Sequence, residues 1–257
     1  MATTSWKTIG VSVPGFSHQA AGMPCQDFHA ICPLDNGWFV GVVSDGAGSA
    51  LRSAEGAKAI CEGLVDYIVP HVTRLTDNNN FALTENIVHP WIVEGIEVVR
   101  SEILKIAADH SITDFHATLI GVIAGPSGGL FFHIGDGAAC ATDVEKFSPS
   151  ILSQPENGEY ANETYFFTQP NWQRHLRLTT FDERFNLLAL MTDGVTPFAL
   201  ASAGPYEPFF GPLSRYLEGH THEEGRSALT AILEKDAIRR ITGDDKTLVW
   251  ALRMQHG

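Results

Sequence analysis

Apolar residues along this chain follow two different periods, and the period changes several times. Short apolar runs bounded by Gly, Pro, Asn or Asp predict strands. These runs are Thr8–Val13, Phe28–Cys32, Trp38–Ser44, Thr118–Ala124, Leu130–Ile134, Thr164–Thr168, Leu187–Met191 and Thr247–Leu252. The turn sequence Asp35-Asn36-Gly37 lies between the second and third runs, and it predicts a β-hairpin there.

Helical spacing replaces strand spacing after this hairpin. Apolar residues three or four apart, from Ala54 to Ile68, predict a helix that ends at Pro70, because proline lacks a backbone donor. A second helix is predicted over about Thr84–Ala108, with Pro90 in its first turn or breaking it there. The apolar residues expected on its buried side are Ile87, Trp91, Val98, Ile103 and Ile106.

The last third of the chain begins without a clear period. Residues 197–212 are rich in Pro, Gly and Phe, which is typical of a flap over a cleft. Thr221-x-x-Glu224 then has the pattern of a capping box and predicts a third helix before the final strand. An order of strands, two helices, strands, one helix and a last strand favours a layered α+β fold over a doubly wound sheet.

Composition narrows the class of protein. A chain of 257 residues buries roughly three quarters of its extended surface on folding, so we expect one domain over residues 1–257. The net charge of −13 argues against a nucleic-acid partner, which would require a basic surface. No apolar run approaches the roughly 20 residues that span a bilayer, and the N-terminal residues lack a signal-peptide pattern. We therefore expect a cytoplasmic protein with no membrane partner.

Acidic residues stand at the ends of the predicted strands. Three apolar strands are each followed by Asp-Gly, and two more acidic points directly precede strands. The residues are Asp45-Gly46, Asp136-Gly137, Asp193-Gly194, Asp27 and Asp244-Asp245. One Asp-Gly is ordinary turn chemistry, but five acidic points at strand ends predict that carboxylates gather at one rim of packed sheets.

Gathered carboxylates require a counter-charge, since each close pair repels by roughly 1–4 kcal/mol. The sequence places no matching set of Lys or Arg near them, so bound metal is the simplest counter-charge. Oxygen ligands without Cys or paired His suit Mg²⁺ or Mn²⁺. Two such ions activate water and clamp an oxyanion during in-line displacement, which makes phosphate ester hydrolysis the leading chemistry.

Other hydrolytic and phosphoryl-transfer sites do not fit the sequence. No cysteine is followed six residues later by arginine, and the aspartyl nucleophile pattern D-x-D-x-[TV] is missing. The nucleotide loop, the serine nucleophile elbow and the H-E-x-x-H zinc motif are missing as well.

Taken in order, the acidic motifs resemble those of a known family. The motifs are Gln26-Asp27, Val43–Gly48, Ala117-Thr118, Ile134–Gly137, Met191–Gly194 and Asp244–Thr247. Their order and spacing, from about Thr8 to Leu252, resemble the metal-dependent type 2C protein phosphatases (the PPM family), and within it a bacterial stand-alone subgroup. The resemblance implies a four-layer α-β-β-α sandwich of two mainly antiparallel sheets flanked by helices.

The resemblance also implies roles for individual residues. Asp45 would bridge two metals, one of them also bound by the Gly46 carbonyl, and Asp193 and Asp244 would hold the second metal. Asp27 would act mainly through water on a metal, and Asp136 matches an aspartate that serves a third, more labile metal. Asp245 stands where many relatives have Asn, and we expect it to add an acid to this metal-binding set. Asp45 and Asp193 are therefore the expected catalytic centre.

Two positions depart from the family pattern. Gly22 stands where most relatives have a phosphate-binding Arg, and Ala47 stands where many have a His proposed as general acid. His18 is our candidate for either role, because its loop leads into Asp27 and an imidazole donates to phosphate or to a leaving oxygen. Arg52 is a second candidate for binding the substrate phosphate. A His18 that only caps its loop, and an Arg52 that is only solvated, are the alternative interpretations.

The predicted function is hydrolysis of phosphoserine and phosphothreonine in proteins by water activated between two metal ions. The expected partners are a phosphorylated protein and an opposing Ser/Thr kinase. Two alternatives remain open at this point: a non-catalytic phosphatase-like module that senses phosphoproteins or acts as a scaffold, and a phosphohydrolase acting on small molecules.

Overall fold

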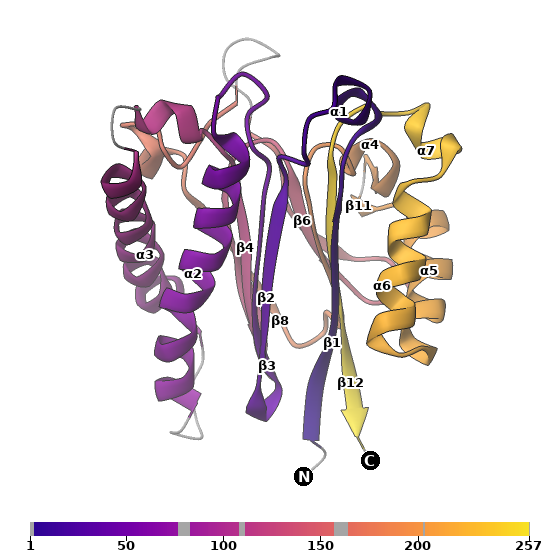
Figure 1. Ribbon diagram of the computed structural model, residues 1–257. Helices are drawn as coiled ribbons and strands as arrows, with labels where there is room; N and C mark the ends of the chain where they lie inside the picture. The colour runs from indigo at the N-terminus through magenta and orange to yellow at the C-terminus, as the bar shows by residue number, and fades with distance from the viewer. Residues whose placement is uncertain (1–2, 77–82, 108–110, 157–163, 203, 257) are drawn as a thin grey trace.

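The computed structural model describes residues 3–76, 83–107, 111–156, 164–202 and 204–256. Two five-stranded sheets stack face to face, and helices cover both outer faces (Figure 1). Sheet I has the order β1 (Thr3–Val13), β12 (Lys246–His256), β9 (Leu187–Met191), β6 (Ala138–Thr142) and β7 (Ser150–Ser153). Sheet II has the order β2 (Phe28–Leu34), β3 (Trp38–Ser44), β4 (Leu119–Gly125), β5 (Gly128–Ile134) and β8 (Arg177–Asp182).

Every pairing within the two sheets is antiparallel. Helices α2 (Ser53–Thr76) and α3 (Glu85–Ile106) cover sheet II, while α5 (Glu207–Gly219) and α6 (His222–Leu233) cover sheet I (Figure 1). The predicted α-β-β-α sandwich is confirmed. Short helices α1 (Phe16–Ala21), α4 (Thr196–Ala199) and α7 (Asp236–Arg239) lie at one end of the sandwich.

The apolar core is divided into three layers. One cluster lies between α2, α3 and sheet II, and a second lies between α5, α6 and sheet I. The third lies between the two sheets, where Val43, Phe131 and Leu190 are fully buried. Strands that are buried on both faces need apolar residues at successive positions, which is why β3 and β9 appear in the sequence as continuous apolar runs.

Two helices differ from the sequence prediction because their prolines are tolerated. Helix α2 continues through Pro70 to Thr76, and α3 runs through Pro90 in its second turn. Both prolines are exposed, so the carbonyls that lose a partner face solvent, while Ile68 and Val72 hold α2 in the core on either side of Pro70. The prediction that α2 ends at Pro70 was wrong.

The buried face of α3 is also shifted from the prediction. Its buried side chains include Val88, Ile92, Ile96 and Val99 together with the predicted Ile103. Val98 and Ile106 were predicted to be buried, but they are 46% and 57% exposed. Because α3 is apolar on more than one face, spacing alone does not fix which face meets the sheet.

Three strands of the two five-stranded sheets are not evident in the sequence, and one predicted strand does not form. Strands β6 and β7 are short, and β8 is mainly polar, so their apolar signal is weak. Residues Thr164–Thr168 form no named strand. The predicted flap at 197–212 consists of α4, the short strands β10 (Leu200–Ala201) and β11 (Gly204–Pro205), and the start of α5, with Phe210 fully buried against sheet I.

The register of the strands places all five acidic points at one end of the sandwich. Phe28 pairs with Ser44, so Asp27 before β2 and Asp45 after β3 are neighbours. Leu248 pairs with Met191, so the start of β12 and the end of β9 also meet. Among the described residues, no helix is both long and apolar enough to cross a lipid bilayer.

Candidate metal centre

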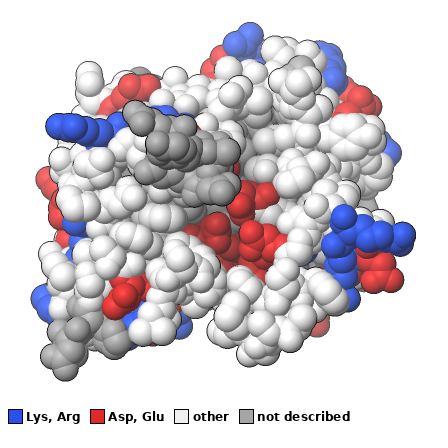
Figure 2. All heavy atoms as spheres, turned by 90° about the horizontal axis from the view of Figure 1, so that it is seen from above, with Lys and Arg blue, Asp and Glu red and all other residues white. Residues whose placement is uncertain are grey.

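Carboxylates from both sheets meet at this end of the sandwich. Asp45 follows β3 of sheet II, Asp193 follows β9 of sheet I, and Asp136 lies in the connection from β5 to β6 that passes between the sheets. One carboxylate oxygen from each of these three residues lies within 4.8 Å of the other two. Figure 2 shows the result from above as a hollow with acidic residues at its floor and mainly uncharged residues around it.

Asp27 is deeply buried, with 4% of its surface exposed. Its Oδ2 accepts a hydrogen bond from the Thr192 hydroxyl at 2.8 Å, and Thr192 Oγ1 in turn accepts the backbone N–H of Thr247 at 3.0 Å. Its Oδ1 is buried without a partner. Burial raises the pKa of Asp27 to about 7. The side chain is therefore held in place through one oxygen, while the other is left for a ligand.

The carboxylates at the centre are poorly compensated. Burial raises the pKa of Asp193 to about 7, and the negative charges of Asp136 and Asp244 add to the shift. The pKa of Asp45 is raised well above its usual range by burial and by Asp27 and Asp193. In each case loss of solvation comes first and like charge second. These raised pKa values mean that the ionised forms are disfavoured in this site, and that a bound cation would favour them.

The protein supplies little positive charge of its own. Lys246 is almost fully buried, and its Nζ donates to the Asp244 carbonyl at 2.6 Å rather than to a carboxylate. Burial lowers the pKa of Lys246. Within the part of the chain that the structure describes, no ion pair joins a lysine or arginine to Asp27, Asp45, Asp136, Asp193 or Asp244.

These features fit a divalent cation with oxygen ligands. Asp27 and Asp136 each have a buried Oδ1 without a partner, and buried polar atoms of this kind are uncommon unless an ion or water satisfies them. The other oxygen of Asp136 accepts a hydrogen bond from the Thr164 hydroxyl, which fixes the carboxylate. The three clustered carboxylates provide oxygen donors of the kind that Mg²⁺ and Mn²⁺ prefer.

Gly46 follows Asp45 where the backbone is crowded. A Cβ at Gly46 would lie 2.7 Å from the Gln26 carbonyl oxygen and 2.8 Å from the Ser53 carbonyl carbon. Gly46 also forms an isolated bridge with Ala117. Glycine is needed here for close packing of the loops around Asp45, and the role of its carbonyl as a metal ligand stays a prediction.

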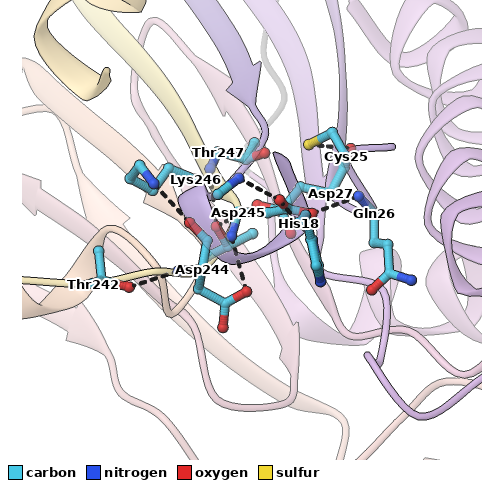
Figure 3. Close-up of polar contacts among 11 residues, drawn as sticks. His18, Cys25, Gln26, Asp27, Thr242, Asp244, Asp245, Lys246 and Thr247 are labelled. Atoms are coloured by element: carbon cyan, nitrogen blue, oxygen red, sulfur yellow. Dashed lines mark hydrogen bonds and ion pairs between the residues drawn. The ribbon is translucent and has the colours of Figure 1, made fainter. Parts of the chain in front are cut away.

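Asp245 lies beside the cluster, and its contacts differ from those of the other acids. It is 1% exposed, and its carboxylate accepts the backbone N–H groups of Gly15 and Gln26, both at 2.6 Å. His18 Nδ1 lies 2.9 Å from the same carboxylate (Figure 3). The predicted site residue His18 is therefore brought next to Asp245, on the loop that leads to Asp27.

Arg52 is directed elsewhere. Its guanidinium forms two hydrogen bonds with Glu55, a third with the Ile106 carbonyl, and stacks over the Phe115 ring at 4.4 Å. These contacts hold Arg52 at the start of α2, and none of them involves an acid of the cluster. These contacts do not bring Arg52 to the acidic cluster, and its role in phosphate binding stays a prediction.

The departure at Gly22 has a local explanation. Gly22 ends α1 with a φ of 66°, in the left-handed region that glycine adopts at helix ends.

Sequence reasoning missed the supporting residues Thr164, Thr192 and Lys246. Only Thr192 and Lys246 had a signal, since both are adjacent to a predicted acidic site residue.

Comparison with known proteins decides the family. Residues 14–234 match the family model described as Protein phosphatase 2C. The chain belongs to the protein phosphatase 2C family. It is 31% identical over 260 residues to serine/threonine-protein phosphatase 3 of Escherichia coli (strain K12), an alignment that covers 96% of this chain and 98% of that protein.

Solved structures agree at the level of the fold. The serine/threonine phosphatase Stp1 from Staphylococcus aureus superposes with a TM-score of 0.64 at 12% identity, covering 96% of this chain and 94% of that one. The catalytic domain of the serine/threonine protein phosphatase PstP, in complex with two manganese ions, superposes with a TM-score of 0.60 at 13% identity, covering 98% and 100%.

Proposed function

We propose that this member of the protein phosphatase 2C family is a metal-dependent phosphatase that hydrolyses phosphoserine and phosphothreonine in proteins. The observation that carries the proposal is the group of Asp45, Asp136 and Asp193, three carboxylates within 4.8 Å of one another that form no ion pair with a lysine or arginine among the described residues. A non-catalytic module would lose stability by keeping such a group. We also propose that residues 1–257 form one catalytic domain.

The proposed metals are two Mn²⁺ or Mg²⁺ ions, and Asp136 would hold a third, more labile ion. Asp45 and the Gly46 carbonyl would hold one ion, and Asp45, Asp193 and Asp244 the other. When bound, such ions lower the pKa of water and neutralise charge on phosphate oxygens. Asp27, held by Thr192, would accept a hydrogen bond from water in the site.

The remaining task of the chain is to bind the phosphate and the leaving oxygen. The imidazole of His18 is our candidate, because its Nδ1 lies 2.9 Å from Asp245 Oδ1 and the side chain is only 14% exposed. When both of its nitrogens are protonated, an imidazole whose Nδ1–H faces a carboxylate has Nε2–H as a hydrogen-bond donor to a phosphate oxygen or to the leaving oxygen. The described residues visible around the hollow are mainly uncharged, which favours a polypeptide substrate over a small polyanionic metabolite (Figure 2).

A phosphatase of this kind implies a counterpart, because phosphorylated proteins arise by kinase action. We propose that the physiological substrate is the product of a Ser/Thr kinase. The cytoplasmic location stays a prediction.

The proposal is tested with purified protein and p-nitrophenyl phosphate at a series of Mn²⁺ and Mg²⁺ concentrations. We expect turnover that EDTA removes and that Asp193→Asn abolishes, while circular dichroism shows an unchanged fold. Asp182→Asn, at an exposed acid paired with Arg184, is the matched control and should retain turnover.

A second assay separates the remaining alternatives. Phosphoserine and phosphothreonine peptides are compared with phosphorylated sugars and nucleotides at equal concentration. Faster release of phosphate from the peptides supports a protein phosphatase, whereas preference for a metabolite contradicts it. No turnover of any substrate with either metal would support the sensor or scaffold instead.

A further inference from the structure

The carboxylate of Asp245 contacts three residues of the loop between β1 and β2, and a role as a metal ligand would not need these contacts. Its Oδ1 accepts the Gly15 N–H and lies 2.9 Å from His18 Nδ1, and its Oδ2 accepts the Gln26 N–H. These three partners are spread from one end of the loop to the other. A single carboxylate therefore holds both ends of the loop by hydrogen bonds and lies against its one histidine.

The backbone around Asp245 is fitted to the same loop. Ser17 N–H donates to the Gly243 carbonyl at 3.0 Å. A Cβ added at Gly15 would lie 2.3 Å from the Gly243 carbonyl oxygen and from the Asp244 carbonyl carbon. The loop thus packs directly on residues 243–245, and Asp245 forms the polar centre of that contact. Because the carboxylate is 1% exposed, water does not compete for its hydrogen bonds.

The imidazole of His18 faces Asp245 with Nδ1, at 2.9 Å from Oδ1. In Figure 3 the other ring nitrogen of His18 points away from Asp245, to the same side as the carboxylate of Asp244. Asp244 directly precedes Asp245 in the chain and is the acid proposed above to hold the second ion. His18 Nε2 is therefore presented on the side of the loop where the proposed substrate phosphate would bind.

We infer that Asp245 is a positioning residue that clasps the β1–β2 loop and orients His18 toward the site, rather than a metal ligand. The inference rests on the proposed phosphatase function. It divides the roles of two adjacent aspartates: Asp244 belongs to the metal site, while both carboxylate oxygens of Asp245 are occupied by donors from the protein.

The first test is Mn²⁺ binding measured by isothermal titration calorimetry without substrate. We expect Asp245→Asn to keep the stoichiometry of the wild type with a Kd within about threefold. Asp244→Asn, the matched neighbour, should lose an ion or weaken it more than tenfold. Loss of an ion in Asp245→Asn, equal to the loss in Asp244→Asn, would overturn the inference.

The second test reads the clasp itself by hydrogen exchange of the metal-free protein. We expect the backbone amides of Gly15 and Gln26 to exchange faster in Asp245→Asn. The asparagine side chain has one oxygen and one NH₂ group, so it can accept a hydrogen bond from only one of these two N–H groups, and its NH₂ group faces the other. The amides within α2 should be unchanged, which separates local release from general unfolding. Unchanged exchange at Gly15 and Gln26 would contradict the clasp.

The third test is a double-mutant cycle in kcat/KM with p-nitrophenyl phosphate. We expect His18→Gln and Asp245→Asn each to lower kcat/KM at least tenfold, and the double variant to be no worse than the more severe single variant. If kcat/KM of the double variant instead falls by the product of the two single losses, the two residues act independently, and the inference is overturned. Gln19→Ala, an exposed position on α1, is the control and should match the wild type.

Asp245→Glu keeps the charge but moves the oxygens by one methylene group. If the position of the carboxylate oxygens matters, Asp245→Glu retains Mn²⁺ binding and still loses turnover. Turnover equal to that of the wild type would show that the negative charge alone suffices and would contradict the inference. It also provides a second variant should Asp245→Asn fail to fold. Inactive wild-type protein would refute the proposed function, while Mn²⁺ binding and hydrogen exchange would still decide the role of Asp245.

Discussion

Strand β3 and the residue after it belong to two regions with opposite energetics. Val43 is fully buried between the sheets among apolar residues, whereas Asp45, two positions later, is surrounded by other carboxylates. The first region gains stability from apolar burial. The second contains desolvated like charges, which cost stability until a cation binds. The comparison indicates that the inter-sheet core stabilises the fold. The acidic rim, formed by Asp27, Asp45, Asp136, Asp193 and Asp244, destabilises the metal-free protein and so favours binding of a cation.

The sharpest test of this difference is Asp45→Asn. We expect turnover of p-nitrophenyl phosphate to fall below detection, because the residue proposed to join both ions is lost. We also expect the metal-free variant to unfold at a higher temperature than the metal-free wild type, since a desolvated charge surrounded by Asp27 and Asp193 is removed. Calorimetry without metal checks this. A lower unfolding temperature would contradict the view that the rim is destabilising.

Phe131→Ala tests the other region. Its ring is fully buried and packs against Phe181 with centroids 4.9 Å apart. Truncating such a ring lowers the free energy of unfolding by about 3–5 kcal/mol, which chemical denaturation measures. Leu104→Ala, at a side chain that is 57% exposed, is the control and should change it by less than about 0.5 kcal/mol. Equal effects at both positions would contradict the assignment of the core.

The pH dependence of stability distinguishes the two regions without any mutation. Burial raises the pKa values of Asp27 and Asp193 to about 7, well above that of an unfolded aspartate. Between about pH 4 and pH 7 the folded state therefore binds more protons than the unfolded state, so metal-free stability falls as pH rises. We expect the unfolding temperature to be lower at pH 7.5 than at pH 5, and Mn²⁺ to reverse this difference. A metal-free protein that is more stable at pH 7.5 would contradict the raised pKa values.

The smallest effect is expected at the edge of the rim. Gly22 has a φ of 66° and open space around a Cβ, so Gly22→Ala should cost about 1 kcal/mol through backbone conformation alone. Gly219 also has open space but no positive φ, so Gly219→Ala should be neutral or stabilising. Urea denaturation compares the two variants. Equal costs would contradict the conformational explanation of the departure at Gly22.

The sequence was most informative where burial repeats along the chain. The continuous apolar runs of β3 and β9 reveal strands buried on both faces, and the Asp-Gly pairs after them reveal where those strands end. From these alone, Asp45 and Asp193 were expected to meet, and the structure places their carboxylates in one cluster with Asp136. The prediction was wrong or incomplete where the sequence signal is weak. Strand β8 is mainly polar and was not predicted, and Pro70 does not end α2 because it lies on the exposed face of the helix.

Between the neighbours Asp244 and Asp245, only the tertiary structure distinguished the two roles. Apolar periodicity and strand ends are local properties that one stretch of chain expresses by itself, so the sequence determined the layered fold and the acidic rim. Which oxygen meets which donor depends on loops separated by more than 200 residues, as in the hydrogen bond from Gly15 to Asp245. Hydrogen bonds of this kind form only when the sheets have packed, because the local sequence of one loop does not determine which other loop it contacts.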